Sequence, residues 1–137
     1  MGFFSKKVNY PELAEDTLAA KQIHAIEGSL KELIDQISDP LEIVPTDGQA
    51  FVFIGKPPKR FGMAMIDDKV HSLGAAAKEN GIDQLQLQKI NEKLRNAYLH
   101  CQDAPRYQTS VNGKTVVVTP SQKLVEEVAE ITSNIYN

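Results

Sequence analysis

The sequence predicts an α+β protein in which an antiparallel sheet of four to five strands packs with helices as a two-layer sandwich. Apolar residues recur at helical spacing near both ends and in the middle of the chain, and short apolar runs lie between them. Consecutive runs joined by short turns must pair antiparallel. The expected order is one helix, two or three strands, two helices, a hairpin and a last helix. A length of 137 residues predicts a single domain, 1–137.

The first expected element is a long helix between Pro11 and Asp39. Pro11 suits a first helical turn, and the Asp39-Pro40 step disfavours continuing the helix. About 28 residues in a helix span roughly 42 Å, which is long for so small a domain. Either Gly28 divides the helix, or part of it projects and packs against a partner. Its apolar face carries Ile23, Ile26, Leu30, Leu33 and Ile37.

The middle of the chain predicts a pair of antiparallel strands, Gln49–Ile54 and Phe61–Ile66, after a short strand at Leu41–Val44. Side chains alternate between the two faces of a strand. Phenylalanines therefore occupy one face of the first run, and Val52 and Ile54 occupy the other. Because both faces are apolar, we expect the pair to be covered on both sides or to bind a partner.

Two helices are expected next, each with a capping residue at its start. Asp67 or Asp68 is expected to cap a helix over Lys69–Asn80. Asp83 and Gln86 have the spacing of a capping box, which predicts a second helix. The apolar stripe of that second helix consists of Leu87, Ile90, Leu94, Ala97 and Cys101.

The clearest local signal is Asn112-Gly113, the favoured pair for a two-residue type I′ hairpin between Arg106–Val111 and Lys114–Thr119. One face of this hairpin is mostly apolar and is expected to meet the core, while the other is expected to meet water. The water-facing set is Arg106, Gln108, Ser110, Thr115, Val117 and Thr119. The segment 119–122 then predicts the start of the last helix, whose stripe is Leu124, Val128, Ile131 and Ile135.

Charge and cysteine usage restrict the class of protein. The net charge of −3 argues against a nucleic-acid partner. Cys101 is the only cysteine, which fits a reducing compartment. The chain begins with two aromatic residues before Lys6 and Lys7, without the apolar stretch of a signal peptide, and lacks an apolar run of membrane-spanning length. We therefore expect a soluble, cytoplasmic protein with no membrane partner.

The connection between the two central strands is the most unusual segment, because Lys56, Lys59 and Arg60 surround two prolines and Phe61 follows directly. A stiff cationic tip of this kind suits a small anionic ligand or a nucleic-acid backbone. The alternative is a charged hairpin tip that prevents strand edges from aggregating. The prolines lack the N–H groups that a phosphate loop converges on its ligand, which excludes a Walker-type site.

His100, Cys101 and His24 carry the chemistry that could bind haem or a metal ion. A cysteine on an apolar stripe is, in the alternative, a small buried apolar residue. His71 follows Asp67-Asp68 at helical spacing, which is typical of a metal site or, more commonly, of a helix start. The spacing of a multi-ligand zinc site is absent from the sequence.

Catalytic sequence signatures are also absent, including the nucleophile elbow, the zinc-protease motif and glycine-rich nucleotide loops. The leading hypothesis is therefore a non-catalytic binding or interaction module that forms a homodimer. It depends on the long first helix and on the two apolar faces of the central strands. Anion binding by the Lys56–Arg60 turn, and haem or metal binding through the histidines and the cysteine, are the alternatives.

Overall fold

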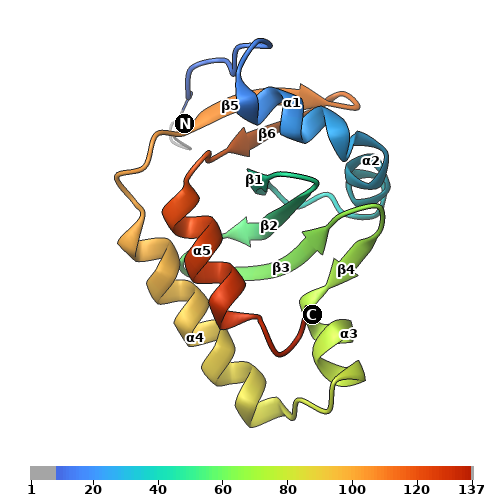
Figure 1. The fold of residues 1–137 in the computed structure, drawn as a ribbon, viewed down its shortest axis with the longest axis vertical. Helices are drawn as coiled ribbons and strands as arrows, with labels where there is room; N and C mark the ends of the chain where they lie inside the picture. The colour runs from blue at the N-terminus through green and yellow to red at the C-terminus, as the bar shows by residue number, and fades with distance from the viewer. Residues whose placement is uncertain (1–8, 137) are drawn as a thin grey trace, which may run out of the picture.

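A computed structural model describes residues 9–136, and in it an α+β fold is built on a six-stranded mixed sheet (Figure 1). Residues 1–8, where the sequence predicts no signal peptide, and residue 137 lie outside the described part. The α+β class is confirmed, whereas the prediction of four to five antiparallel strands is wrong. The elements are α1 (Leu18–Ala25), α2 (Glu27–Gln36), β1 (Leu41–Thr46), β2 (Gln49–Lys56), β3 (Arg60–Ile66), β4 (Val70–Ser72), α3 (Leu73–Glu79), α4 (Gln84–His100), β5 (Tyr107–Val111), β6 (Lys114–Val118) and α5 (Gln122–Ile131).

The strands lie side by side in the order β4-β3-β2-β1-β6-β5. Strands joined by short turns pair antiparallel, as predicted. The pair β1–β6 is parallel, with Glu42 opposite Val117 and Ile43 opposite Val118. Parallel pairing needs a long connection, and here α3, α4 and β5 supply it among other elements. The antiparallel unit β1–β4 and the hairpin β5–β6 are therefore joined inside the sheet by the β1–β6 pair.

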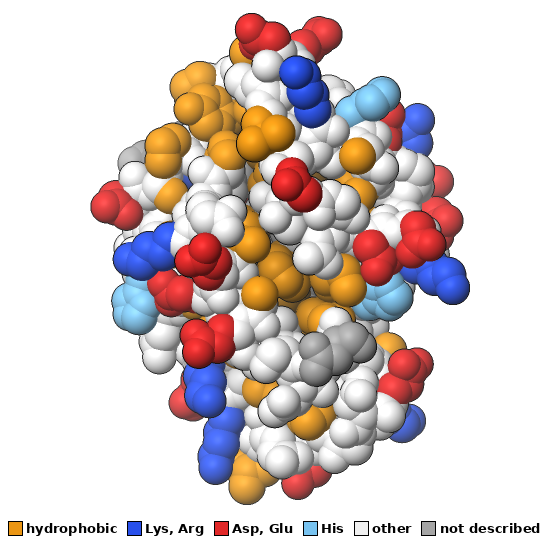
Figure 2. Space-filling model, in the orientation of Figure 1, with side chains coloured by type: hydrophobic (Ala, Val, Ile, Leu, Met, Phe, Trp, Pro, Cys, Tyr) orange, Lys and Arg blue, Asp and Glu red, His pale blue; other side chains and the backbone are white. Residues whose placement is uncertain are grey.

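Helices cover both faces of the sheet, so the predicted two-layer sandwich is wrong (Figure 1). α1 and α2 pack on the face that carries Ile43 and Val52. α3, α4 and α5 pack on the face that carries Phe51 and Phe53. In Figure 2 apolar side chains are visible in a shallow hollow beside α5. The apolar surface that suggested a dimer is therefore mostly buried within the chain itself.

The first helical region is two short helices rather than one long rod. Thr17 caps α1 by accepting a hydrogen bond from the backbone N–H of Ala20, and the helix ends at Ile26. The break falls there, and Gly28 lies inside α2. The predicted apolar face is nevertheless correct, because Ile23, Ile26, Leu30 and Leu33 are buried against the sheet. No part of the region projects as a long arm.

After β3 the structure has a tight turn and the short strand β4, where the sequence predicts the first turn of a helix. Asp67 and Asp68 do not cap a helix. The Asp67 carboxylate accepts a hydrogen bond from the backbone N–H of Lys69 in the turn from β3 to β4. Ser72 caps α3 instead. The capping box of Asp83 that begins α4 is confirmed. The error arose because aspartate favours tight turns as strongly as it favours helix caps.

The hairpin of β5 and β6 has the predicted register, with Val111 opposite Lys114 across the type I′ turn. Its apolar face packs under α1 and α2 as expected. Its polar face is not turned to water throughout. Thr119 is fully buried and the Arg106 side chain is 8% exposed. Ser121 caps α5, within the predicted start at 119–122.

Candidate functional site

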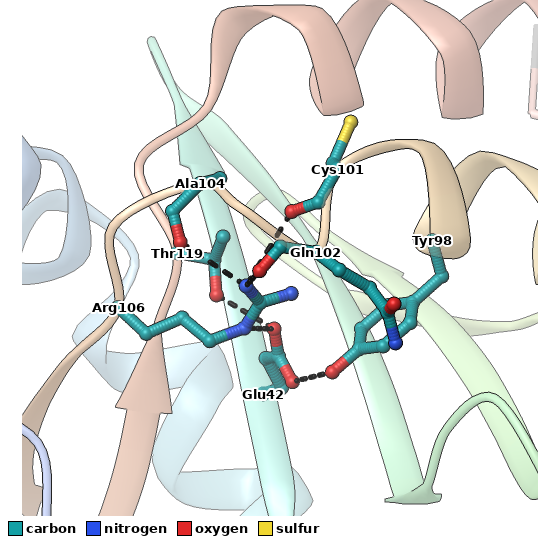
Figure 3. Close-up of polar contacts among 7 residues, drawn as sticks. All are labelled: Glu42, Tyr98, Cys101, Gln102, Ala104, Arg106 and Thr119. Atoms are coloured by element: carbon teal, nitrogen blue, oxygen red, sulfur yellow. Dashed lines mark hydrogen bonds and ion pairs between the residues drawn. The ribbon is translucent and has the colours of Figure 1, made fainter.

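A buried carboxylate lies at the centre of the sheet. Glu42 interrupts an apolar strand, and the pleat of β1 turns its side chain toward α4, where the residue is 8% exposed. A buried carboxylate is costly unless it is paired and hydrogen-bonded. Its Oε1 accepts a hydrogen bond from the Tyr98 hydroxyl at 2.7 Å. Its Oε2 accepts from Arg106 Nε at 3.0 Å and from the Thr119 hydroxyl at 2.6 Å (Figure 3).

Arg106 connects this carboxylate to the loop between α4 and β5. Its Nη1 donates to the backbone carbonyls of Cys101, Gln102 and Ala104 at 3.4, 3.1 and 3.1 Å. Its guanidinium carbon lies 5.2 Å from the centre of the Tyr98 ring. Burial by itself lowers the pKa of Arg106, but the Glu42 charge, Tyr98 and the hydrogen bonds to both together outweigh that effect, and the pKa is raised. Arg106 is therefore a permanent cation that holds the loop against β1.

The cluster is poorly suited to proton transfer. Burial raises the pKa of the Tyr98 hydroxyl, and the hydrogen bond to Glu42 raises it further. Tyr98 therefore keeps its proton at any physiological pH. Three donors use three of the roughly four lone-pair sites of the Glu42 carboxylate. A general base needs a free lone pair within reach of its substrate, and the Glu42 residue is 8% exposed beneath these donors, so the arrangement favours positioning over catalysis.

One donor of this cluster is left over. Arg106 Nη2 is buried and has no hydrogen-bond partner among residues 9–136. Beside it lies a pocket of about 420 Å³ lined by Tyr10, Tyr98, Gln102, Ala104 and Arg106. In Figure 3 the free nitrogen points toward the side of the cluster occupied by Gln102 and Tyr98. The pocket therefore has a buried polar group at its wall.

The cationic turn between β2 and β3 is attached to α4 by a second arginine. Arg95 Nε donates to the Pro58 carbonyl at 2.7 Å, and its guanidinium carbon lies 5.9 Å from the centre of the Phe61 ring. Lys56, Lys59 and Arg60 are exposed around this attachment. Gly55 precedes the turn with φ +114°, where an added Cβ would lie 2.9 Å from the Arg60 carbonyl oxygen. Arg95 thus holds the turn against α4, and the three cations of the turn are exposed to solvent.

An aromatic chain connects the turn to the buried cluster. Phe53 makes edge contacts with Phe61 at 5.5 Å and with Tyr98 at 5.2 Å between ring centres. Arg95 and Tyr98 are three residues apart on α4, so they share one helix face. A single helix face therefore positions both the turn and the Glu42 cluster.

The residues predicted to bind haem or metal are not brought together as a set. His24 lies on α1, where its side chain is 84% exposed and 3.3 Å from Glu27. His100 lies at the end of α4, 62% exposed and 3.3 Å from Glu127. Cys101 is buried beneath the same helix end. In residues 9–136 no three His, Cys, Asp or Glu side chains are placed to hold a metal ion.

The other histidine does lie beside an acidic partner. His71 Nε2 is 3.0 Å from Asp67 Oδ1 across the β3–β4 turn. Burial raises the pKa of Asp67, but hydrogen bonds from Lys69, His71 and Asp68, together with the His71 charge, outweigh it and lower that pKa overall. Asp68 adds no ligand at metal-binding distance to this pair. The pair is an ion pair or hydrogen bond that stabilises a strand turn.

Comparisons with protein-family models, with curated proteins and with solved structures found no match to this chain. The function of the candidate site is therefore inferred from its geometry alone. Among residues 9–136, no helix combines the length and the apolar character needed to cross a bilayer.

Cys101 is expected to resist modification in the folded protein. It is 2% exposed, and burial, reinforced by the nearby Glu127, raises the pKa of its thiol. Because only the thiolate reacts, the aromatic disulfide reagent DTNB should label it at least about a hundred-fold more slowly in native buffer than in urea. As the chain has a single cysteine, absorbance reports this site alone. Rapid labelling of the native protein would show that the thiol is accessible.

The sequence reasoning missed Glu42, Tyr98 and Arg95 as site residues, and it assigned Arg106 and Thr119 to a water-facing surface. One signal was available. An acidic residue within the apolar run 41–44 demands a partner if the strand is central. Arg95 carried no such signal, because a cation on an amphipathic helix is ordinarily a solvated residue.

Proposed function

We propose that this protein is a non-catalytic binding module that holds a phosphate-bearing ligand on the turn of Lys56, Lys59 and Arg60. The observation that carries the proposal is the attachment of this turn to Arg95, which adds a fourth cation beneath three exposed ones. Phosphate oxygens accept charge-assisted hydrogen bonds from such groups, and arginine forks fit them well.

The electrostatics of the turn support the proposal. Among residues 9–136, none of its four cations comes within 4.0 Å of a carboxylate. The whole chain nevertheless has a net charge of −3. The positive charge is therefore local and unneutralised, and a local field of this kind raises the concentration of an anion where it binds.

The rigidity of the turn also supports binding. The hydrogen bond from Arg95 and the packing of Phe61 on Phe53 restrict its backbone before a ligand arrives. A site that is already ordered loses less conformational entropy on binding. A mere solubilising tip would not need a half-buried arginine beneath it.

The self-association hypothesis has lost its main argument, because the chain's own helices cover both faces of the sheet. Haem binding likewise gains no support, since His24 lies apart from His100 and Cys101. We therefore carry forward the anion-binding proposal alone.

Charge reversal tests the proposal. The triple variant K56E/K59E/R60E should bind tripolyphosphate at least about ten-fold more weakly than the wild type, since each charge-assisted hydrogen bond contributes about 1.5–3 kcal/mol. Isothermal titration calorimetry at low and at physiological salt measures the affinity. Wild-type binding should weaken as salt rises, because the cations are exposed to screening.

A matched control distinguishes the effect of the turn on binding from the effect of net charge. Lys31, Lys78 and Lys123 are exposed on α2, α3 and α5, and reversing them changes the net charge by the same amount. This control variant should retain most of the wild-type affinity. Equal losses in the two variants would mean that only the total charge matters and would reject a site at the turn.

A further inference from the structure

The unpartnered Nη2 of Arg106 points to a second binding site, independent of the cationic turn between β2 and β3. Nearly all buried donors in folded proteins have a hydrogen-bond partner, and an exception calls for an explanation. Here the arginine side chain is 8% exposed, and it donates four hydrogen bonds, one to Glu42 and three to backbone carbonyls. Only Nη2 has no acceptor among the described residues.

The space next to this nitrogen is suited to a small molecule. The pocket of about 420 Å³ is lined by two tyrosines, Tyr10 and Tyr98, together with Gln102, Ala104 and Arg106 itself. Planar aromatic walls with one convergent polar group are typical of small-ligand sites. The tyrosine hydroxyl that belongs to the buried cluster is already used on Glu42. The Tyr10 hydroxyl and the Gln102 amide are the other polar groups of the wall, and Arg106 Nη2 is its buried donor without an acceptor among residues 9–136.

The charge balance decides the class of ligand. Arg106 and Glu42 form a pair 3.0 Å apart, so the arginine charge is already neutralised. The other lining residues carry no charge. An anionic ligand would add an unbalanced negative charge close to Glu42, at a cost that burial increases. A neutral acceptor satisfies the nitrogen without that cost.

We propose that this pocket binds an uncharged carbonyl or amide compound whose oxygen accepts a hydrogen bond from Arg106 Nη2. The Gln102 side chain is the movable part of the wall. It is exposed, and its amide makes no hydrogen bond within residues 9–136. Rotation of this side chain uncovers the nitrogen without disturbing the loop, since the loop is held through the Gln102 backbone carbonyl.

Benzamide and benzoate form a matched pair of probes, because they have the same shape and differ in charge. Titration of the full-length ¹⁵N-labelled protein followed by NMR reports on the Arg106 side-chain N–H signals directly. Benzamide should shift these signals and saturate them. Benzoate should bind at least about ten-fold more weakly, because the pair with Glu42 leaves no net positive charge to attract it.

Two variants complete the test. Arg106→Lys removes the guanidinium fork while it keeps a cation for Glu42, and it should abolish the benzamide shifts seen in the remaining pocket residues. Gln102→Ala leaves the cluster intact and should bind benzamide at least as tightly as the wild type, which keeps the test decisive if the lysine variant does not fold. The triple variant K56E/K59E/R60E should bind benzamide normally.

Three outcomes would overturn the proposal. Unchanged Arg106 signals at saturating benzamide would show that the pocket does not take a carbonyl. Equal binding of benzoate would reject the charge argument. A long-lived water that shows cross-relaxation with the Nη2 protons and persists in the presence of benzamide would show that water alone satisfies this nitrogen.

Discussion

Glu42→Ala is expected to lower the free energy of unfolding by about 3–5 kcal/mol, because it leaves Arg106 as an unpaired buried cation. The hydroxyls of Tyr98 and Thr119 also lose their acceptor. Because the loop after α4 is fastened through the same arginine, we expect the loss to affect the whole cooperative transition. Urea unfolding at neutral pH, followed by circular dichroism, measures it.

A double variant distinguishes the ion pair from simple loss of packing. Arg106→Met alone leaves Glu42 buried without its counter-ion and should cost a similar amount. Removing both charges in Glu42→Leu/Arg106→Met should cost clearly less than the sum of the single changes, since neither charge is then left unpaired. Additive losses would show that the two side chains act independently and would contradict the arrangement in Figure 3.

Phe53→Ala should cost about 3–5 kcal/mol, the range for deleting a fully buried phenylalanine. Phe53 is 0% exposed and contacts Phe61 and Tyr98 through its ring. Its removal leaves a cavity between the cationic turn and the Glu42 cluster. The same variant should therefore also weaken tripolyphosphate binding, because Phe61 loses the ring that orders the turn.

Two comparisons make the Phe53 result interpretable. Phe53→Leu keeps most of the apolar volume and should be clearly less destabilising than the alanine variant. Leu85→Ala removes a side chain that is 63% exposed and should change stability by no more than about 0.5 kcal/mol. A small effect of Phe53→Ala, similar to that of the exposed leucine, would contradict a core at this position.

Local patterns predicted most of the elements, because each was encoded within a few neighbouring residues. The Asn112-Gly113 turn set the register of the last hairpin, and Asp83 with Gln86 marked the start of α4. The pairing of β1 with β6 was beyond such reasoning. It joins segments about seventy residues apart, and nothing in either strand specifies a parallel neighbour.

The candidate site was only partly predictable for a related reason. Alternation along β5 and β6 correctly separated Arg106 and Thr119 from the apolar face. It could not show that α4 would cover the polar face and bring Tyr98 above Glu42. A strand pattern indicates which side chains share a face, but whether that face meets water depends on elements elsewhere in the chain.

The parallel joint at the centre of the sheet has a consequence during synthesis on the ribosome. A growing chain completes β1–β4 long before Lys114–Val118 emerges, so the outer edge of β1 waits unpaired. Exposed apolar edges recruit strands from other molecules. Glu42 stands on that edge as an isolated charge pointing toward the future core, which discourages such recruitment. We therefore expect the same carboxylate to protect the nascent chain from such contacts before it anchors the finished one.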